Sequence, residues 1–170
     1  MRPAASDYPE YFHKYVSLVP EDDVFAALEP QVALIEGLAA GLDPSRETFA
    51  YAPGKWSVRE LLGHVCDAER VFAYRALTFS RYDAVSLPGF DEGTWTPHGH
   101  FADTPLRRLA GEFGLLRRAN LEMLRRLDDA QWQAGGKGDN QPITVRALAY
   151  VMAGHVRHHL NVLRDRYAIA

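Results

Sequence analysis

Two histidines near the end of the sequence, His155 and His159, have the spacing of a metal-binding pair. On an α-helix, residues i and i+4 leave the same face, so both imidazoles can reach one ion. A third histidine, His64, lies far upstream. If a facing helix carries it, the site has three nitrogen ligands and an open position for water or substrate. Such a ligand count is typical of a catalytic metal site rather than a closed structural one.

The two segments that carry these histidines begin alike. Trp56 and Ile143 are each followed by a hydroxyl residue and then by Val-Arg-x-Leu. Ser57 and Thr144 are good N-cap residues, and Glu60 completes a capping box with Ser57. From these caps His64 lies seven residues on, while His155 and His159 lie eleven and fifteen residues on. Offsets that differ by four predict related faces of two helices.

Other interpretations of the polar residues remain open at this stage. His158 lies at i+3 from His155 and competes with His159; the i+4 spacing favours His159. A lone histidine on an apolar face, such as His64, is more often a core residue with a satisfied hydrogen bond. Asp67 could orient the His64 imidazole. Gly63 and Gly154 would keep space open beside the histidines. Arg59 and Arg146 could bind an anionic group of a substrate. The loop histidines His98 and His100 are expected to be exposed.

Composition indicates an ordinary globular chain. It has 170 residues, 47% of them hydrophobic, and a formal net charge of -3. These values argue against general affinity for nucleic acid or for an anionic membrane surface. We find no run of about 18 apolar residues and expect no membrane partner. The single cysteine, Cys66, excludes an intramolecular disulfide. Cys66 is expected to be a buried, inert thiol, and a cytoplasmic location is the simplest expectation.

Helical periodicity dominates the sequence, and strand-like alternation is nearly absent. We predict a short helix over 9–16, then four main helices. The first starts near Pro20, is kinked or restarted at Pro30, and ends at Gly41. The others run from Ser57 to about Arg81, from Thr104-Pro105 to before Gly135, and from Ile143 to about Tyr167. Four such helices in a chain of this size predict an all-α four-helix bundle. The connection over 82–103 is long enough to cross over the bundle. We expect a single domain over 1–170, with residues 1–20 as an N-terminal extension packing on the bundle.

The motifs together resemble a known family. The run from Trp56 through His64 to Arg70, the segment Leu87-Pro-Gly-Phe-Asp91, and the run from Gly154 to His159 are similar to the DinB-like superfamily of small metalloproteins. The resemblance implies a four-helix bundle, often a homodimer, with a divalent metal held by three histidines. Residue by residue, those ligands are His64, His155 and His159. Zinc or nickel are the first choices, with manganese and iron as alternatives.

The resemblance also suggests an activity. Characterised relatives include S-transferases and isomerases that use low-molecular-weight thiols such as bacillithiol or mycothiol. The leading hypothesis is therefore a metal-dependent enzyme, such as a thiol S-transferase with a thiol as co-substrate, acting on a small molecule. The alternatives are a metal-dependent hydrolase and a non-enzymatic metal-binding stress-response dimer. A metal-free helical domain with a histidine cluster is a third alternative. The loop with Phe90, Trp95 and His98 is expected to line or cover the pocket.

Overall fold

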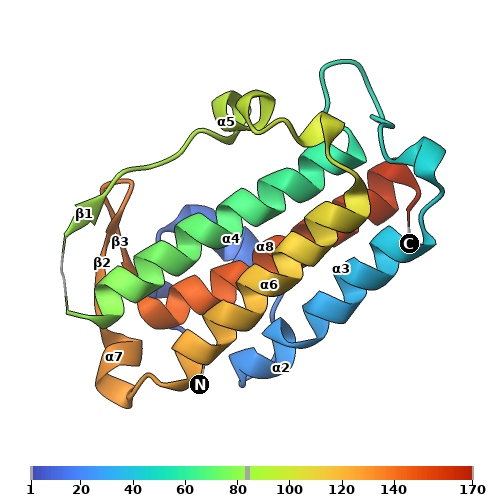
Figure 1. Cartoon of the computed structure of the whole chain (residues 1–170). Coiled ribbons are helices and arrows are strands. Elements are labelled where there is room, and N and C mark those ends of the chain that lie inside the picture. Colours follow the sequence, from blue (N-terminus) through green and yellow to red (C-terminus); the bar gives the residue numbers. More distant parts are fainter. Residues whose placement is uncertain (1, 83–84, 170) are drawn as a thin grey trace.

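The computed structural model describes residues 2–82 and 85–169. Four long helices form a bundle, as predicted (Figure 1). They are α3 (Pro30–Gly41), α4 (Val58–Ser80), α6 (Leu106–Arg125) and α8 (Val145–Tyr167). Their apolar faces meet in a core in which residues such as Phe79, Phe113 and Leu148 are fully buried.

The order of the helices in space requires a crossover. α4 packs against both α6 and α8, and α3 packs against α6. α4 and α6 run in the same direction and α8 runs in the opposite one (Figure 1). The link from α4 to α6 must therefore return along the whole bundle. It contains β1 (Ser86–Leu87), α5 (Glu92–His98) and the short 3-10 helix η4 (Phe101–Asp103). This confirms the predicted crossover, although the link contains short elements where a plain loop was expected; Asp83 and Ala84 lie outside the described residues.

The helix starts follow local sequence signals with one exception. Ser57 and Glu60 form the predicted capping box of α4, and the Thr144 hydroxyl accepts from the Ala147 amide at the start of α8. Pro30 is the first residue of α3. Thr104, at the predicted start of α6, could have been its N-cap but is not, because the Thr104 hydroxyl donates to the His100 carbonyl. Instead the Glu47 carboxylate, just after the 3-10 helix η3 (Pro44–Arg46), accepts from the Leu106 amide.

A small sheet closes one end of the bundle. β2 (Gly135–Gly138) and β3 (Gln141–Thr144) form an antiparallel hairpin, and β1 joins β2 in parallel. Asp139 and Asn140, at φ 54° and 59°, make the two-residue turn that such a hairpin prefers. The helix predicted to run up to Gly135 in fact ends at Arg125, and α7 (Asp129–Gln133) follows separately. The sequence predicted neither the β-hairpin nor the break between α6 and α7.

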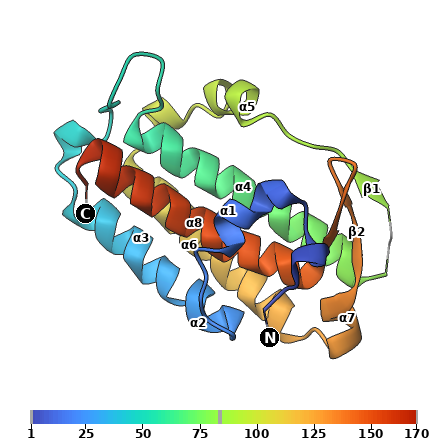
Figure 2. The ribbon, with the colours of Figure 1, turned by 180° about the vertical axis from the view of Figure 1, so that it is seen from behind.

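The N-terminal segment lies along α8. It contains the 3-10 helices η1 (Ala5–Asp7) and η2 (Glu10–Phe12) and the helix α1 (His13–Val16), which packs on α8 (Figure 2). After α1 the chain turns into α2 (Val24–Leu28) and α3.

One stretch, Val24–Gly41, has the length and mean hydropathy (1.3) of a membrane span, with 39% of it buried. The sequence had led us to expect no such stretch. It covers α2 and α3, and its contacts are those of a bundle helix. α3 packs on α6, and Gln31 is buried and donates to the Ala153 carbonyl of α8.

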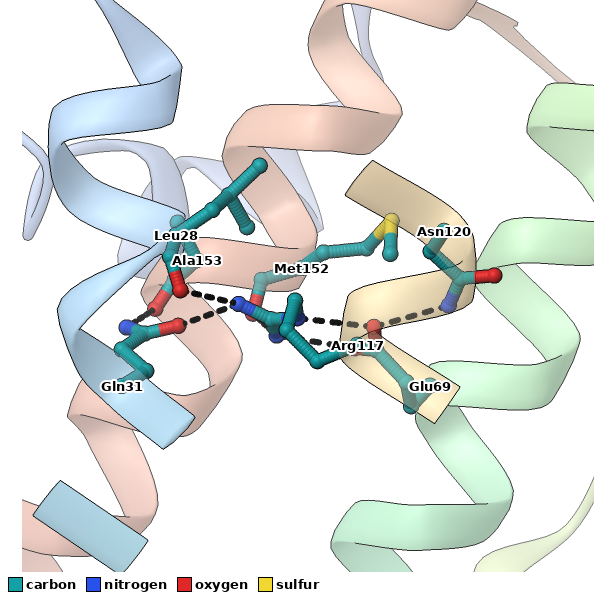
Figure 3. Close-up of polar contacts among 7 residues, drawn as sticks. All are labelled: Leu28, Gln31, Glu69, Arg117, Asn120, Met152 and Ala153. Atoms are coloured by element: carbon teal, nitrogen blue, oxygen red, sulfur yellow. Dashed lines mark hydrogen bonds and ion pairs between the residues drawn. The ribbon is translucent and has the colours of Figure 1, made fainter. Parts of the chain in front are cut away.

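A buried ion pair ties the four helices together (Figure 3). Arg117 of α6 donates from Nε and Nη2 to the two carboxylate oxygens of Glu69 on α4, both at 2.8 Å. Its Nη1 donates to Gln31 Oε1 at 2.6 Å and to the Leu28 carbonyl at 3.2 Å. Asn120 Nδ2 donates to Glu69 at 2.9 Å. We call Arg117, Glu69, Gln31 and Asn120 the arginine cluster.

Candidate metal centre

The antiparallel pair α4 and α8 brings the three predicted histidines together. His64 lies in the second turn of α4, and His155 and His159 lie on the inward face of α8. Their ligand atoms all lie within 4.8 Å of one another. His64 and His155 are buried, and His159 is partly buried. The N-caps and the apolar periodicity of each helix are local signals. Once the two helices pack, these signals are enough to place the three histidines opposite one another.

His155 occupies the centre of the histidine cluster. Its Nε2 lies 3.1 Å from His64 Nε2 and 3.1 Å from His159 Nε2. A neutral imidazole nitrogen carries either one hydrogen or one in-plane lone pair, so a single tautomer of His155 serves both neighbours poorly. A cation between the three nitrogens accepts all three lone pairs at once. Two nitrogens bound tetrahedrally to one zinc ion lie about 3.3 Å apart, close to the observed separations.

Burial keeps these imidazoles in the form that binds metal. Burial is the main cause that lowers the pKa of His64 to about 4, partly opposed by the charge of Glu92. Burial, followed by the neighbouring imidazoles, holds the pKa of His155 and of His159 well below the ordinary value. All three rings are therefore neutral at pH 7, with lone pairs free for a cation. The donor set is suited to zinc, nickel, copper or iron rather than to magnesium or calcium.

Aromatic rings surround the histidine cluster. Trp56 lies with its ring 4.8 Å from that of His64, and Tyr15 and Phe72 lie edge-on to His155 at 5.3 Å and 5.6 Å. Burial raises the pKa of the Tyr15 hydroxyl, which stays protonated at neutral pH. Such walls limit the access of water and strengthen electrostatic interactions inside the site.

Two hollows reach the histidine cluster. A cavity of about 270 Å³ opens beside His64 and His155, between the N-terminal segment, α4 and the crossover link. Its walls include Phe12, Tyr15, Phe72, Arg75, Phe90 and Glu92. A second hollow of about 320 Å³ reaches His159 and is lined by Trp56, Tyr51 and His158. An ion at the cluster would therefore be accessible to small molecules.

Several sequence predictions about neighbouring residues can now be judged. His158 packs its ring against Tyr15 and His159, at 5.4 Å and 5.1 Å, and does not join the converging set. His98 and His100 are exposed, as expected. Phe90 lines the cavity, and the exposed Trp95 packs against the Phe90 ring. Cys66 is fully buried, and burial raises the pKa of its thiol.

The supporting roles proposed for some residues are not found. Asp67 pairs with Arg70 at 3.8 Å rather than orienting His64. Arg59 pairs with Glu47 at 2.7 Å, and Arg146 lines a different hollow.

Gly63 and Gly154 do not hold space open beside the histidines. A Cβ at Gly63 would overlap the Phe101 ring, and one at Gly154 would overlap the Tyr15 carbonyl. These glycines instead let the crossover link and the N-terminal segment approach closely.

Sequence reasoning missed Arg75 and Glu92, which line the cavity. For Arg75 a signal existed. It lies eleven residues after His64, which is three helical turns and therefore the same face of α4.

Comparisons with known proteins agree with this picture. A family model described as the DinB superfamily matches residues 27–163. Among solved structures, one is described as "YfiT from Bacillus subtilis is a probable metal-dependent hydrolase with an unusual four-helix bundle topology". It is 19% identical, with a TM-score of 0.77 over 100% of this chain and 95% of that chain. At this identity the likeness shows the fold alone. No curated protein gave a significant match.

Proposed function

This chain belongs to the DinB superfamily, and from that premise we propose that it is a metal-dependent enzyme whose ion is held by His64, His155 and His159. The observation that carries the proposal is the convergence of three neutral Nε2 atoms, 3.1 Å apart in two pairs, at the end of a cavity. A divalent ion held by neutral imidazoles keeps its full charge and lowers the pKa of a bound water or thiol.

We further propose that the reaction is the transfer of a low-molecular-weight thiol to a small electrophile. Two hollows approach the histidine cluster from different sides, one at His64 and His155 and the other at His159. A reaction with two organic substrates can use both, whereas hydrolysis needs only one. The aromatic walls hold an apolar electrophile, and the Tyr15 hydroxyl can donate a hydrogen bond.

Hydrolysis is the second candidate. It is favoured by the description of the similar YfiT structure as a probable metal-dependent hydrolase. A third alternative is a binding protein in which the ion has no catalytic role. The three alternatives share the histidine cluster and differ in what enters the cavity.

The first experiment is elemental analysis of protein purified without a histidine tag. We expect about one divalent ion per chain in the wild type, and loss of that ion in His155→Ala and His159→Ala. His158→Ala is the matched control, since His158 lies beside the cluster without joining it. Full metal content in both ligand variants would show that the assignment is wrong.

The second experiment tests the activity of the metal-loaded protein. A panel of thiols is combined with chloronitrobenzene and with epoxides, and the same protein is assayed with esters and amides in the absence of thiol. Thiol-dependent product that is lost in His159→Ala supports S-transfer. Thiol-independent product supports hydrolysis, and tight metal binding without any turnover supports the binding protein.

We also propose a homodimer in the cytoplasm, by the family resemblance. Tyr74 and Leu77 on α4 and Leu115 on α6 are exposed apolar residues on two helices that pack together. Sedimentation that shows a monomer at micromolar concentration would refute the dimer.

A further inference from the structure

The floor of the cavity holds a buried arginine, Arg75, that forms no ion pair with an acid among the described residues. Arg75 is only 4% exposed and lines the cavity together with Phe72 and Phe90. It lies on the same face of α4 as His64, about 16 Å further along the helix axis. His64 and His155 of the histidine cluster and Arg75 therefore line one cavity from positions three helical turns apart on α4 and from α8.

The hydrogen bonds of Arg75 are incomplete. Nη2 donates to the Pro88 carbonyl at 2.7 Å. Nε is buried without a partner among the described residues. The guanidinium lies flat against Gly138, where an added Cβ would be 3.1 Å from Nε, Cζ and Nη1. A Cβ at position 138 would therefore require the guanidinium to shift by a few tenths of an ångström.

No carboxylate forms an ion pair with Arg75 within 4 Å in the described part of the chain. Asp139 acts on Arg75 through space, without an ion pair. A buried charge without a partner is costly, and proteins rarely keep one unless something neutralises it. Arg117 shows the ordinary solution, a bidentate pair with Glu69. Arg75 is nearly as buried, at 4% exposed against 0% for Arg117, and has no such carboxylate partner among the described residues.

We propose that Arg75 binds an anionic group of the substrate, so that the substrate of this site is an organic carboxylate with an apolar body. An arginine fork suits a carboxylate, which accepts two parallel hydrogen bonds. Phe72, Phe90 and Phe12 line the same cavity and suit an aromatic or aliphatic body. The cavity volume of about 270 Å³ limits the ligand to a small molecule.

The other charges of the cavity restrict the ligand further. Glu92 and Asp139 also line it. A ligand with a second negative charge beside either acid would be repelled, so a monoanion is expected to bind better than a dianion. The inference rests on the proposed function, because it names the class of molecule that the metal site would act on.

The test compares two probes of equal shape, 4-phenylbutyrate and its neutral analogue 4-phenylbutyramide. Dissociation constants are measured by calorimetry on the purified protein, both as isolated and after zinc addition. We expect the wild type to bind the carboxylate at least tenfold more tightly than the amide. In Arg75→Gln we expect this ratio to fall to near one, while affinity for the amide stays unchanged.

Two further variants keep the result interpretable. Arg75→Lys retains the charge without the fork and should keep part of the preference. Arg70→Gln removes an exposed arginine of the same helix that pairs with Glu112, and should leave the ratio unchanged. Circular dichroism establishes that each variant is folded.

The proposal is overturned if the wild type binds both probes equally, or if Arg75→Gln keeps the preference for the carboxylate. The second result would mean that the metal, rather than Arg75, binds the anion. A protein that binds no metal yet shows the Arg75-dependent preference would refute the metal proposal and leave the anion site standing.

Discussion

Helix α4 carries two buried polar residues, Glu69 and His64, that lie little more than one turn apart. Each belongs to a different cluster, and the two clusters differ in how completely their polar groups are hydrogen-bonded. In the arginine cluster the guanidinium of Arg117 donates to Glu69, Gln31 and a backbone carbonyl, and Asn120 supplies a further bond to the carboxylate. In the histidine cluster three imidazole nitrogens converge without a shared hydrogen-bond pattern that serves all of them, and His159 Nδ1 has no partner among the described residues. One cluster is complete within the protein, and the other is not.

The difference indicates which cluster holds the bundle together and which one serves a ligand. A fully satisfied buried network fixes the relative positions of the helices that contribute to it. An incomplete one costs free energy in the absence of a ligand and is retained where a ligand completes it. Arg75 belongs with the histidine cluster in this respect, since its Nε also lacks a partner.

Breaking the arginine cluster should have the largest effect. Arg117→Met leaves Glu69 as a buried, unpaired carboxylate, which we expect to lower the free energy of unfolding by about 3–5 kcal/mol. The double variant Glu69→Leu/Arg117→Met should cost clearly less, because no charge is left alone. Urea unfolding at pH 7 measures both. A loss below about 1 kcal/mol in the single variant would contradict the structural role of the pair.

Loading the histidine cluster with metal should have the next largest effect. Zinc at a free concentration 100 times its dissociation constant should stabilise the wild type by about 2.7 kcal/mol. His159→Ala should gain nothing from zinc and should be about as stable as the metal-free wild type, because its imidazole forms no satisfied network. Thermal melting with and without chelator measures the shift, and His158→Ala should keep the full response. Equal stabilisation of His159→Ala would mean that zinc acts elsewhere.

The sequence predicts the histidine cluster and misses the anion site for a physical reason. Caps, apolar periodicity and the i+4 spacing are local signals, and the positions of Ser57, Thr144 and the three histidines follow from them. Arg75 is unusual only because of what surrounds it, namely Pro88 in the crossover link and Gly138 in the hairpin. Neither neighbour is near it in sequence.

Other errors have the same origin. The hairpin over 135–144 contains three glycines and no alternating apolar pattern, so its strands are specified by the turn at Asp139 and Asn140 rather than by periodicity. The cap of α6 comes from Glu47, almost sixty residues earlier. Nothing in the sequence around Glu47 indicates that it would cap α6.

Disturbing the close approach of the N-terminal segment to α8 should have an effect on stability of intermediate size. A Cβ at Gly154 would overlap the backbone of Tyr15, which cannot move as freely as a side-chain tip. We expect Gly154→Ala to cost about 1–3 kcal/mol of unfolding free energy, as overpacking does. It should also weaken zinc binding, since it displaces the wall beside His155. Gly37→Ala is the control: nothing lies near its added Cβ, and it should stabilise helix α3 by about 0.5–1 kcal/mol. Equal effects of the two substitutions would show that Tyr15 does not press on α8.

The smallest expected effect comes from an ion pair near the surface, which shows what burial adds. Arg157 on α8 donates from Nη2 and Nη1 to the two carboxylate oxygens of Glu21, at 2.6 Å and 2.8 Å, so this pair is bidentate like the one in the arginine cluster. These hydrogen bonds lower the pKa of Glu21 below its ordinary value of 4.5. A carboxyl with a depressed pKa in the folded state stabilises the protein above its unfolded pKa. That contribution is lost as the pH falls through the folded pKa.

We therefore expect Glu21→Gln to lower the free energy of unfolding by about 0.5 kcal/mol at pH 7, because water screens a partly exposed pair. The difference between wild type and variant should shrink toward zero near pH 3 and should also shrink in 1 M salt. Urea unfolding at the two pH values measures it. A difference that is the same at both pH values would mean that Glu21 acts through packing rather than through its charge. A bidentate arginine–carboxylate pair is thus expected to be worth several times more at Arg117 than at Arg157, because only at Arg117 does the loss of one partner leave a buried charge with no access to water.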